Sequence, residues 1–239
     1  MTKVRTLLLG IATAASFGAA AHAADMPDNW SYSRPEPRFV EMVSGWYLRG
    51  DAGYRLNRVS SFEAPSNTIT DVKYTDSLGL TFGAGYKYQW FRSDVTVDYG
   101  PRVGVDARSS SGAAQPQYAM KVASFSVLAN LYIDLGTWYG FTPYVGGGVG
   151  VSYLQGRDYT DTTLAVNHAV TNDRTNFSWA AMAGVSYRIS PRWLVDVGYR
   201  HLDLGDLPAT TGTNLASDRT LWKGLTADEI RLGVRFILD

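Results

Sequence analysis

Histidine and cysteine, two side chains often used for acid–base and nucleophilic chemistry near neutral pH, are scarce in this 239-residue chain, which has three histidines and no cysteine. His201 precedes Asp203 by two residues, so in a β-strand the two side chains share a face and could pair. A nucleophile would have to come from another segment, and Ser152 and Ser178 lie on neighbouring predicted strands. An enzyme built on His201 is therefore one hypothesis, and a histidine in a polar rim is the simpler one.

Other chemical signatures are missing from the sequence. There is no HExxH motif, no phosphate-binding loop and no metal-ligand spacing, and His168 has only Asn167 and Ala169 beside it. Lysine plus arginine and aspartate plus glutamate both number 22, so no basic patch for nucleic acid is expected. We therefore predict no catalytic residue, no metal site, no cofactor and no nucleic-acid partner.

A larger set of ionic residues recurs at alternate positions of several segments, on the face opposite to the apolar residues. Eight cations and six anions on this face would need partners if buried together. We predict an ion-pair network, with a structural or gating role, in the interior of a barrel. Its members are Arg49, Asp51, Lys87, Arg92, Asp94, Asp98, Asp134, Arg188, Asp196, Arg200, Glu229, Arg231 and Arg235, with Arg55 on the same face.

One set of contacts follows from a predicted turn. A two-residue turn at 90–91 would place Gln89 opposite Arg92 and Lys87 opposite Asp94 on adjacent strands. All four side chains would then point inward, which is self-consistent. The sequence thus predicts a Lys87–Asp94 pair.

Two further pairs follow from strand direction in the last two predicted strands. Asp196 and Arg235 fall at the same depth near one end, and Arg200 and Glu229 near the other. Because neighbouring antiparallel strands bring such residues together, we expect both pairs to form.

The elements that must position these residues show a strict period of two. In residues 46–55, Trp46, Leu48 and Tyr54 fall on one face, and Arg49 and Asp51 fall on the other. The same alternation occurs in eight segments, at about 46–55, 77–89, 91–99, 121–134, 142–153, 176–189, 193–200 and 229–238. None of the apolar-face positions is charged, although 18% of the chain is. A charge facing lipid costs about 2–4 kcal/mol at mid-bilayer, which explains this exclusion.

These features predict an all-β fold, an eight-stranded antiparallel up-and-down transmembrane β-barrel with apolar side chains outward. Connections alternate between short and roughly twenty residues, as in outer-membrane barrels. A soluble periplasmic β-sandwich or lipocalin-like barrel, with its apolar face inward, is the alternative. Aromatic residues cluster near the two ends of the predicted strands, which predicts two girdles at the membrane interfaces. The girdle near the short turns contains Trp46, Trp90, Trp138 and Trp193. The girdle near the long connections contains Tyr54, Tyr99, Tyr153 and Tyr199.

The N-terminal segment reads as an export signal. Lys3 and Arg5 precede an apolar run that closes with Ala21-His22-Ala23, and we expect cleavage before Ala24. Residues 1–23 are then a signal peptide, 24–44 an extended periplasmic segment and 45–239 the barrel. An even number of strands places both termini in the periplasm.

Three stretches carry a family resemblance: GWYLRGDAGY at 45–54, PYVGGGVG at 143–150 and GYRHLDLG at 198–205. They resemble the small outer-membrane β-barrel family, which includes the OmpA-type transmembrane domain and the alphaproteobacterial porin-family surface antigens. The resemblance implies an eight-stranded barrel inserted by the outer-membrane assembly machinery. Members of the family commonly end on an outward aromatic residue, whereas here Asp239 follows Phe236 and Leu238.

These observations predict an integral outer-membrane protein with a structural or surface-antigen role, an ion-paired lumen and four long external loops. Two alternatives stay open: a narrow porin-like channel for small solutes, and an adhesin or surface-binding module that acts through the loops. The expected partners are outer-membrane lipids, lipopolysaccharide and the assembly machinery, and the expected state is a monomer.

Overall fold

The computed structural model describes residues 44–63, 69–109, 117–161, 166–167, 172–210 and 219–238. The predicted signal peptide and all but the last residue of the predicted periplasmic segment lie outside these ranges, as do His168 and Asp239. All described elements belong to the second of two compact units, residues 39–239. Within the described ranges every regular element is a β-strand, and no helix there is long and apolar enough to span a membrane.

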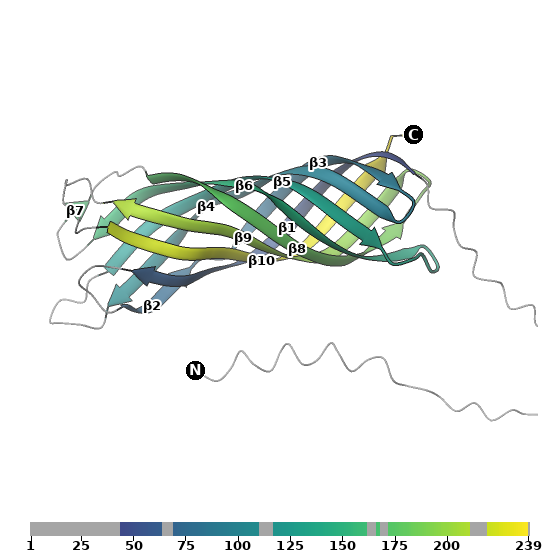
Figure 1. Cartoon of the computed structure of the whole chain (residues 1–239). Coiled ribbons are helices and arrows are strands. Elements are labelled where there is room, and N and C mark those ends of the chain that lie inside the picture. Colours follow the sequence, from purple (N-terminus) through teal and green to yellow (C-terminus); the bar gives the residue numbers. More distant parts are fainter. Residues whose placement is uncertain are drawn as a thin grey trace, which may run out of the picture. The chain divides into compact units, whose positions relative to one another are not determined.

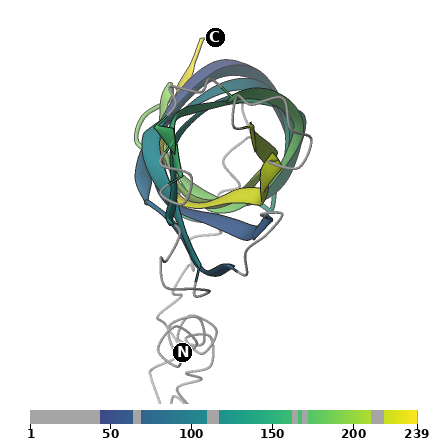
Figure 2. The same ribbon diagram turned by 90° about the vertical axis from the view of Figure 1, so that its left-hand side faces the viewer.

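Eight long strands form the wall of a closed antiparallel barrel, which confirms the predicted fold class. Each strand pairs with the next wall strand along the chain, and the last pairs with the first to close the ring (Figure 2). The wall strands are β1 (Gly45–Glu63), β3 (Ser77–Tyr88), β4 (Phe91–Ser109), β5 (Gln117–Asp134), β6 (Phe141–Asp161), β8 (Asn172–Arg188), β9 (Trp193–Thr210) and β10 (Arg219–Ile237).

Two short strands extend the wall at one end. β2 (Ile69–Tyr74) precedes β3 and pairs with the last part of β4, and β7 (Val166–Asn167) pairs with the last residues of β6. In Figure 1 both lie at the end of the barrel opposite the C-terminus. We call the part of the barrel next to them the loop half, and the part next to the connections 89–90, 135–140 and 189–192 the turn half.

In the turn half the side chains alternate as predicted. On β1, Trp46 and Leu48 are 57% and 48% exposed on the outside of the wall, whereas Arg49 and Asp51 are each 7% exposed inside it. Large apolar side chains on the other wall strands, such as Val95, likewise face outward. This is the arrangement predicted for a barrel in lipid and the reverse of that predicted for a soluble barrel.

In the loop half the arrangement is reversed. Arg102, Asp106 and Lys121 are exposed on the outside, whereas the interior contains buried apolar side chains. That apolar cluster includes Phe62, Val105, Met120, Leu154, Leu204, Leu207, Trp222 and Leu225.

Irregularities in register accompany this change of face. The pairing of β4 with β5 shifts between Gly100 and Val103, and that of β10 with β9 shifts between Trp222 and Leu225. A β-bulge inserts one residue and so moves the following side chains to the other face. Asp98 and Val105 therefore both point inward, although they lie seven positions apart and would face opposite sides of a regular strand.

The predicted length of the external connections is wrong. The strands of the loop half run far beyond the predicted ends, to Glu63, Ser109, Asp161 and Thr210. The connection from β1 to β3 spans residues 64–76 and contains β2, and that from β4 to β5 spans only residues 110–116, instead of roughly twenty residues each. The prediction relied on uncharged outward positions, and in the loop half the outward positions are charged although the strands continue.

Candidate functional site: the ion-paired interior

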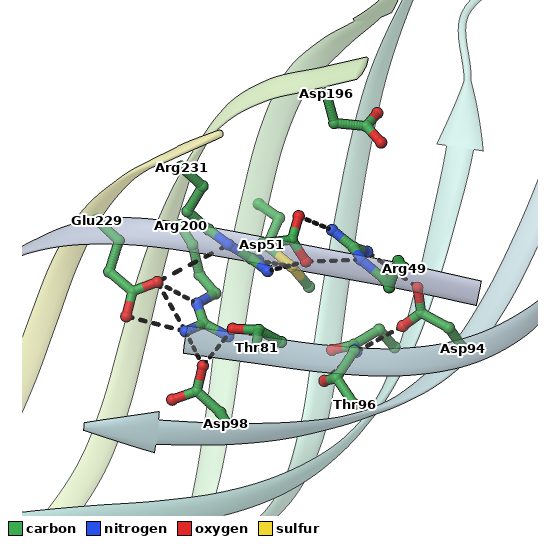
Figure 3. Close-up of polar contacts among 12 residues, drawn as sticks. Arg49, Asp51, Thr81, Asp94, Thr96, Asp98, Asp196, Arg200, Glu229 and Arg231 are labelled. Carbon is green, nitrogen blue, oxygen red and sulfur yellow. Dashed lines mark hydrogen bonds and ion pairs between the residues drawn. The ribbon is translucent and has the colours of Figure 1, made fainter. Parts of the chain in front are cut away.

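Asp98 is the centre of the ionic layer closest to the loop half (Figure 3). It is fully buried, it accepts a hydrogen bond from Thr81 Oγ1 at 2.6 Å, and it pairs with both Arg55 and Arg200. Arg200 also binds Glu229 at 2.7 Å, and Arg55 lies 2.5 Å from the same carboxylate. These groups come from β1, β3, β4, β9 and β10, so the layer ties opposite sides of the wall together.

A second layer is centred on Arg49 and Asp94. Arg49 binds Asp51 and Asp94, each at 2.9 Å, and donates to the Tyr132 hydroxyl at 2.8 Å. Asp51 lies between Arg49 and Arg231, whose Nη2 is 2.9 Å from Asp51 Oδ2 (Figure 3). Every one of these side chains is buried, so the cations are paired with carboxylates and shielded from bulk water.

The third layer lies toward the short turns. Asp134 accepts from Lys87 Nζ at 2.6 Å and from Arg92 Nε at 2.8 Å. Across the barrel, Arg235 Nε lies 2.7 Å from Asp196 Oδ2. Each of the two carboxylates is at most 4% exposed.

Two tyrosines close the interior around Arg92. The guanidinium carbon of Arg92 lies 4.8 Å from the ring centre of Tyr132 and 4.6 Å from that of Tyr144, which is cation–π distance. A cavity beside Tyr132 and Tyr144 has a volume of about 10 Å³, and another near Lys87 and Arg235 is of the same size. Each cavity has room for about one water molecule.

The structure tests the predicted pairs individually. Asp196 with Arg235 and Arg200 with Glu229 form as predicted. The pair of Lys87 with Asp94 is wrong, because Lys87 faces Arg92 in the register and binds a carboxylate of β5 instead.

The error lies in the position of the turn. Gln89 and Trp90 form the turn, not residues 90–91, and Gln89 has a φ of 54°. Gln89 therefore does not face Arg92 as predicted; Lys87 does. The observed turn shifts the pairing of β3 with β4 by two residues relative to the prediction. Because the shift is even, every side chain stays on its predicted face.

The remaining predicted site residues lie where alternation places them. All thirteen predicted members of the ionic set occupy inward positions, with Arg188 half-buried near the short turns. The girdle residues Trp46, Trp90, Trp138, Trp193, Tyr54, Tyr99, Tyr153 and Tyr199 are all at least 37% exposed. Their contact with a membrane interface stays a prediction.

The predicted pair of His201 with Asp203 does not form. His201 Nδ1 lies 2.7 Å from Asp228 Oδ1 on the outside of the wall, and Asp203 accepts from the backbone of Gly205. Ser152 and Ser178 do face inward, but they bind each other at 2.5 Å. The wall thus separates the imidazole from these hydroxyls.

Three tyrosines of the interior are absent from the predicted site. Tyr47 donates to Asp94 at 2.9 Å, and Tyr132 and Tyr144 enclose Arg92. The signal was present, because each occupies an inward position of its strand. The girdle prediction, however, assigns aromatic side chains only to the outer surface of the barrel.

Comparison with known proteins gives a consistent result. The family model of the outer membrane protein beta-barrel domain matches residues 9–236. An uncharacterised protein of Brucella suis is 29% identical and the match covers 83% of this chain and 80% of that protein. A Rickettsia prowazekii protein whose name proposes an adhesin is 28% identical over 70% of this chain and 76% of its own length.

Two solved structures share the fold. Neisserial surface protein A is 17% identical with a TM-score of 0.54, and the match covers 82% of this chain and 98% of that one. OprG of Pseudomonas aeruginosa is 16% identical with a TM-score of 0.51, covering 82% and 97%. At this identity the likeness concerns the architecture alone.

Proposed function

Since the chain belongs to the outer membrane protein β-barrel family, we propose that it is a sealed barrel that holds its loop half at the cell surface. Its role is then structural and antigenic, not the conduction of solutes. The observation that carries this proposal is the enclosure of Arg92 by Tyr132 and Tyr144, together with the ion-paired layers around Arg49 and Asp98. An eight-stranded barrel is only just wide enough to be filled by its own side chains.

Planar-bilayer recording tests the sealed interior. The wild-type protein should give no stable unitary current. The Y132A/Y144A double variant removes both rings around Arg92 and should conduct more than the wild type. Tyr187→Ala, on the lipid-facing side of β8, is the matched control and should stay silent. Stable unitary currents from the folded wild-type protein would contradict the proposal.

The proposed orientation places both termini in the periplasm and the loop half outside the cell. Because the chain has no cysteine, single cysteines are clean reporters. Asp106→Cys, exposed in the loop half, should react with a membrane-impermeant maleimide on intact cells. Thr137→Cys, beside a short turn, should react only after the outer membrane is permeabilised. The reverse labelling pattern would overturn the proposed orientation. A mature chain that does not start at Ala24 would overturn the predicted cleavage of the signal peptide.

A second candidate function is adhesion. It is favoured by the similarity to rickettsial proteins whose names propose adhesins, at 26–28% identity over about 70% of this chain. Replacement of the four connections 64–68, 110–116, 162–171 and 211–218 by short turns should then abolish binding of expressing bacteria to cultured cells. Binding that survives all four replacements would remove this candidate.

A further inference from the structure

We propose that a groove on the outside of β4, β5 and β6 binds lipid A, the phosphorylated and acylated glucosamine disaccharide that anchors lipopolysaccharide. An acyl chain would lie against aromatic side chains, and phosphates would meet Arg102 and Lys121. The inference deepens the proposed function and rests on its orientation, which places this face in the outer leaflet.

The groove has aromatic walls and a small floor. Tyr99, Phe125 and Tyr153 lie side by side in register on the three strands, each exposed on the outside. One step toward the loop half, Ala123 forms the floor, 7% exposed, with Gln155 opposite it on β6. The open hollow beside these residues has a volume of about 270 Å³, just below the roughly 300–1,000 Å³ typical of small-molecule sites.

A bulge brings a cation to the edge of this groove. The register shift between Gly100 and Val103 sets Pro101 and Arg102 together against the single residue Ala123. Bulges re-aim side chains in this way, and proline is tolerated there because no ladder donor is needed. Arg102 is exposed, and among the residues that the structure describes it has no carboxylate partner.

Two further cations flank the groove on the loop side. Lys121 lies two residues beyond Ala123 on β5 and faces Arg157 of β6 in the register. Lys121 binds Asp158 at 3.1 Å with both side chains more than half exposed, and Arg157 pairs with Asp173. Such exposed pairs contribute little and exchange readily, so a phosphate is able to compete for Lys121.

The depth of the groove favours a lipid over a soluble ligand. The next row toward the short turns is purely aliphatic, with Val97, Val127 and Val151 in register and all exposed. The groove thus lies where the apolar outer surface gives way to charge, which is where acyl chains meet phosphorylated headgroups. Three neighbouring cations suit a lipid with more than one phosphate, whereas a phospholipid carries one. Arginine is well matched to phosphate oxygens because its guanidinium can bind two of them at once.

Native mass spectrometry of the full-length protein in detergent tests the site with purified bisphosphorylated lipid A. The wild type should retain one lipid A per chain and prefer it to phosphatidylglycerol. Ala123→Phe fills the groove and should lower retention about tenfold, whereas Ala129→Phe, on the lipid-facing surface of the same strand, should not. Arg102→Gln should lower affinity for lipid A by about tenfold, as expected for one lost charge-assisted hydrogen bond.

The migration of unheated and boiled samples establishes that each variant is folded. Equal retention of lipid A by the wild type, Ala123→Phe and Arg102→Gln would overturn the site, as would equal retention of phosphatidylglycerol. Because this measurement uses micelles, it is independent of orientation and conductance. Failure of the site and failure of the proposed function are therefore distinguishable.

Discussion

The turn half and the loop half of the barrel bury opposite kinds of side chain within one continuous sheet. In the turn half, arginines and carboxylates fill the interior and large apolar residues cover the outside. In the loop half, Trp222, Leu204 and Met120 are buried inside and Arg58 and Lys121 are exposed outside. The outside of a wall must suit its solvent, so lipid requires the first arrangement and water permits the second.

The reversal occurs at a similar place on several strands. On β4 the outward aromatic residue Tyr99 is followed by the outward cation Arg102, and on β6 the outward Tyr153 is followed by Arg157. The boundary follows the predicted tyrosine girdle, where we expect the acyl region of the membrane to end. The two halves should therefore respond differently to mutation, and four predictions test this.

Loss of the Asp98 carboxylate should have the largest effect. Asp98→Asn leaves Arg55 and Arg200 without this anionic partner in a buried layer, so we expect destabilisation of about 5 kcal/mol, the upper range for breaking a buried pair. Urea unfolding in lipid vesicles, followed by tryptophan fluorescence, measures it. Asp106→Asn, exposed on the same strand, should change stability by less than about 0.5 kcal/mol. Equal effects of the two variants would show that the ionic layer is dispensable.

Truncation of Trp222 should weaken the loop half selectively. Its indole is fully buried, and its ring centre lies 4.3 Å from that of Phe62. Trp222→Ala should therefore destabilise the packing of the loop half by about 4 kcal/mol. Amide hydrogen exchange should accelerate in the ends of β1, β9 and β10 that face the loops, while amides around Arg49 and Asp94 stay protected. A uniform loss of protection along these strands would mean that the halves unfold as one unit.

The turn half was largely predictable from the sequence because lipid imposes one rule on every outward position. Asp196–Arg235 and Arg200–Glu229 followed from strand direction alone, since each pair lies on adjacent strands. Contacts across the lumen, such as Arg200 with Asp98, depend on how the barrel closes, which local pattern does not contain.

Two other features gave little local signal. The turn at Gln89 was misplaced because glutamine is not a residue that marks a left-handed turn position. The sequence pattern predicts long connections in place of the loop half, because bulges interrupt the alternation of apolar and polar residues there and the outward residues are polar. The apolar cluster around Leu204 and Trp222 was missed for the same reason.

A charge introduced on the outside should distinguish the two halves directly. Val95 is 55% exposed midway between the outward aromatics Phe91 and Tyr99 of β4, so Val95→Arg should cost about 3 kcal/mol in lipid. Asp106→Arg, outward on the same strand in the loop half, should be nearly neutral. Refolding yield and urea midpoints in vesicles report the difference. A neutral Val95→Arg would place that part of β4 outside the acyl region.

The smallest effect concerns the exposed ion pair of the loop half. Hydrogen bonds from Arg157, and then from Tyr153, hold the pKa of the Asp173 carboxyl below its usual value. A carboxyl with a lowered folded-state pKa contributes stability above its unfolded pKa, and that contribution is lost as the pH falls through the folded value. Because the group is exposed, stability should change little, and NMR titration of the Asp173 carboxyl is the suitable measurement. Arg157→Gln should return the pKa toward the usual value for aspartate, whereas Arg174→Gln, on the same strand as Asp173, should not. An ordinary Asp173 pKa in the wild type would mean that water, not Arg157, solvates this carboxylate, as befits a surface beyond the lipid.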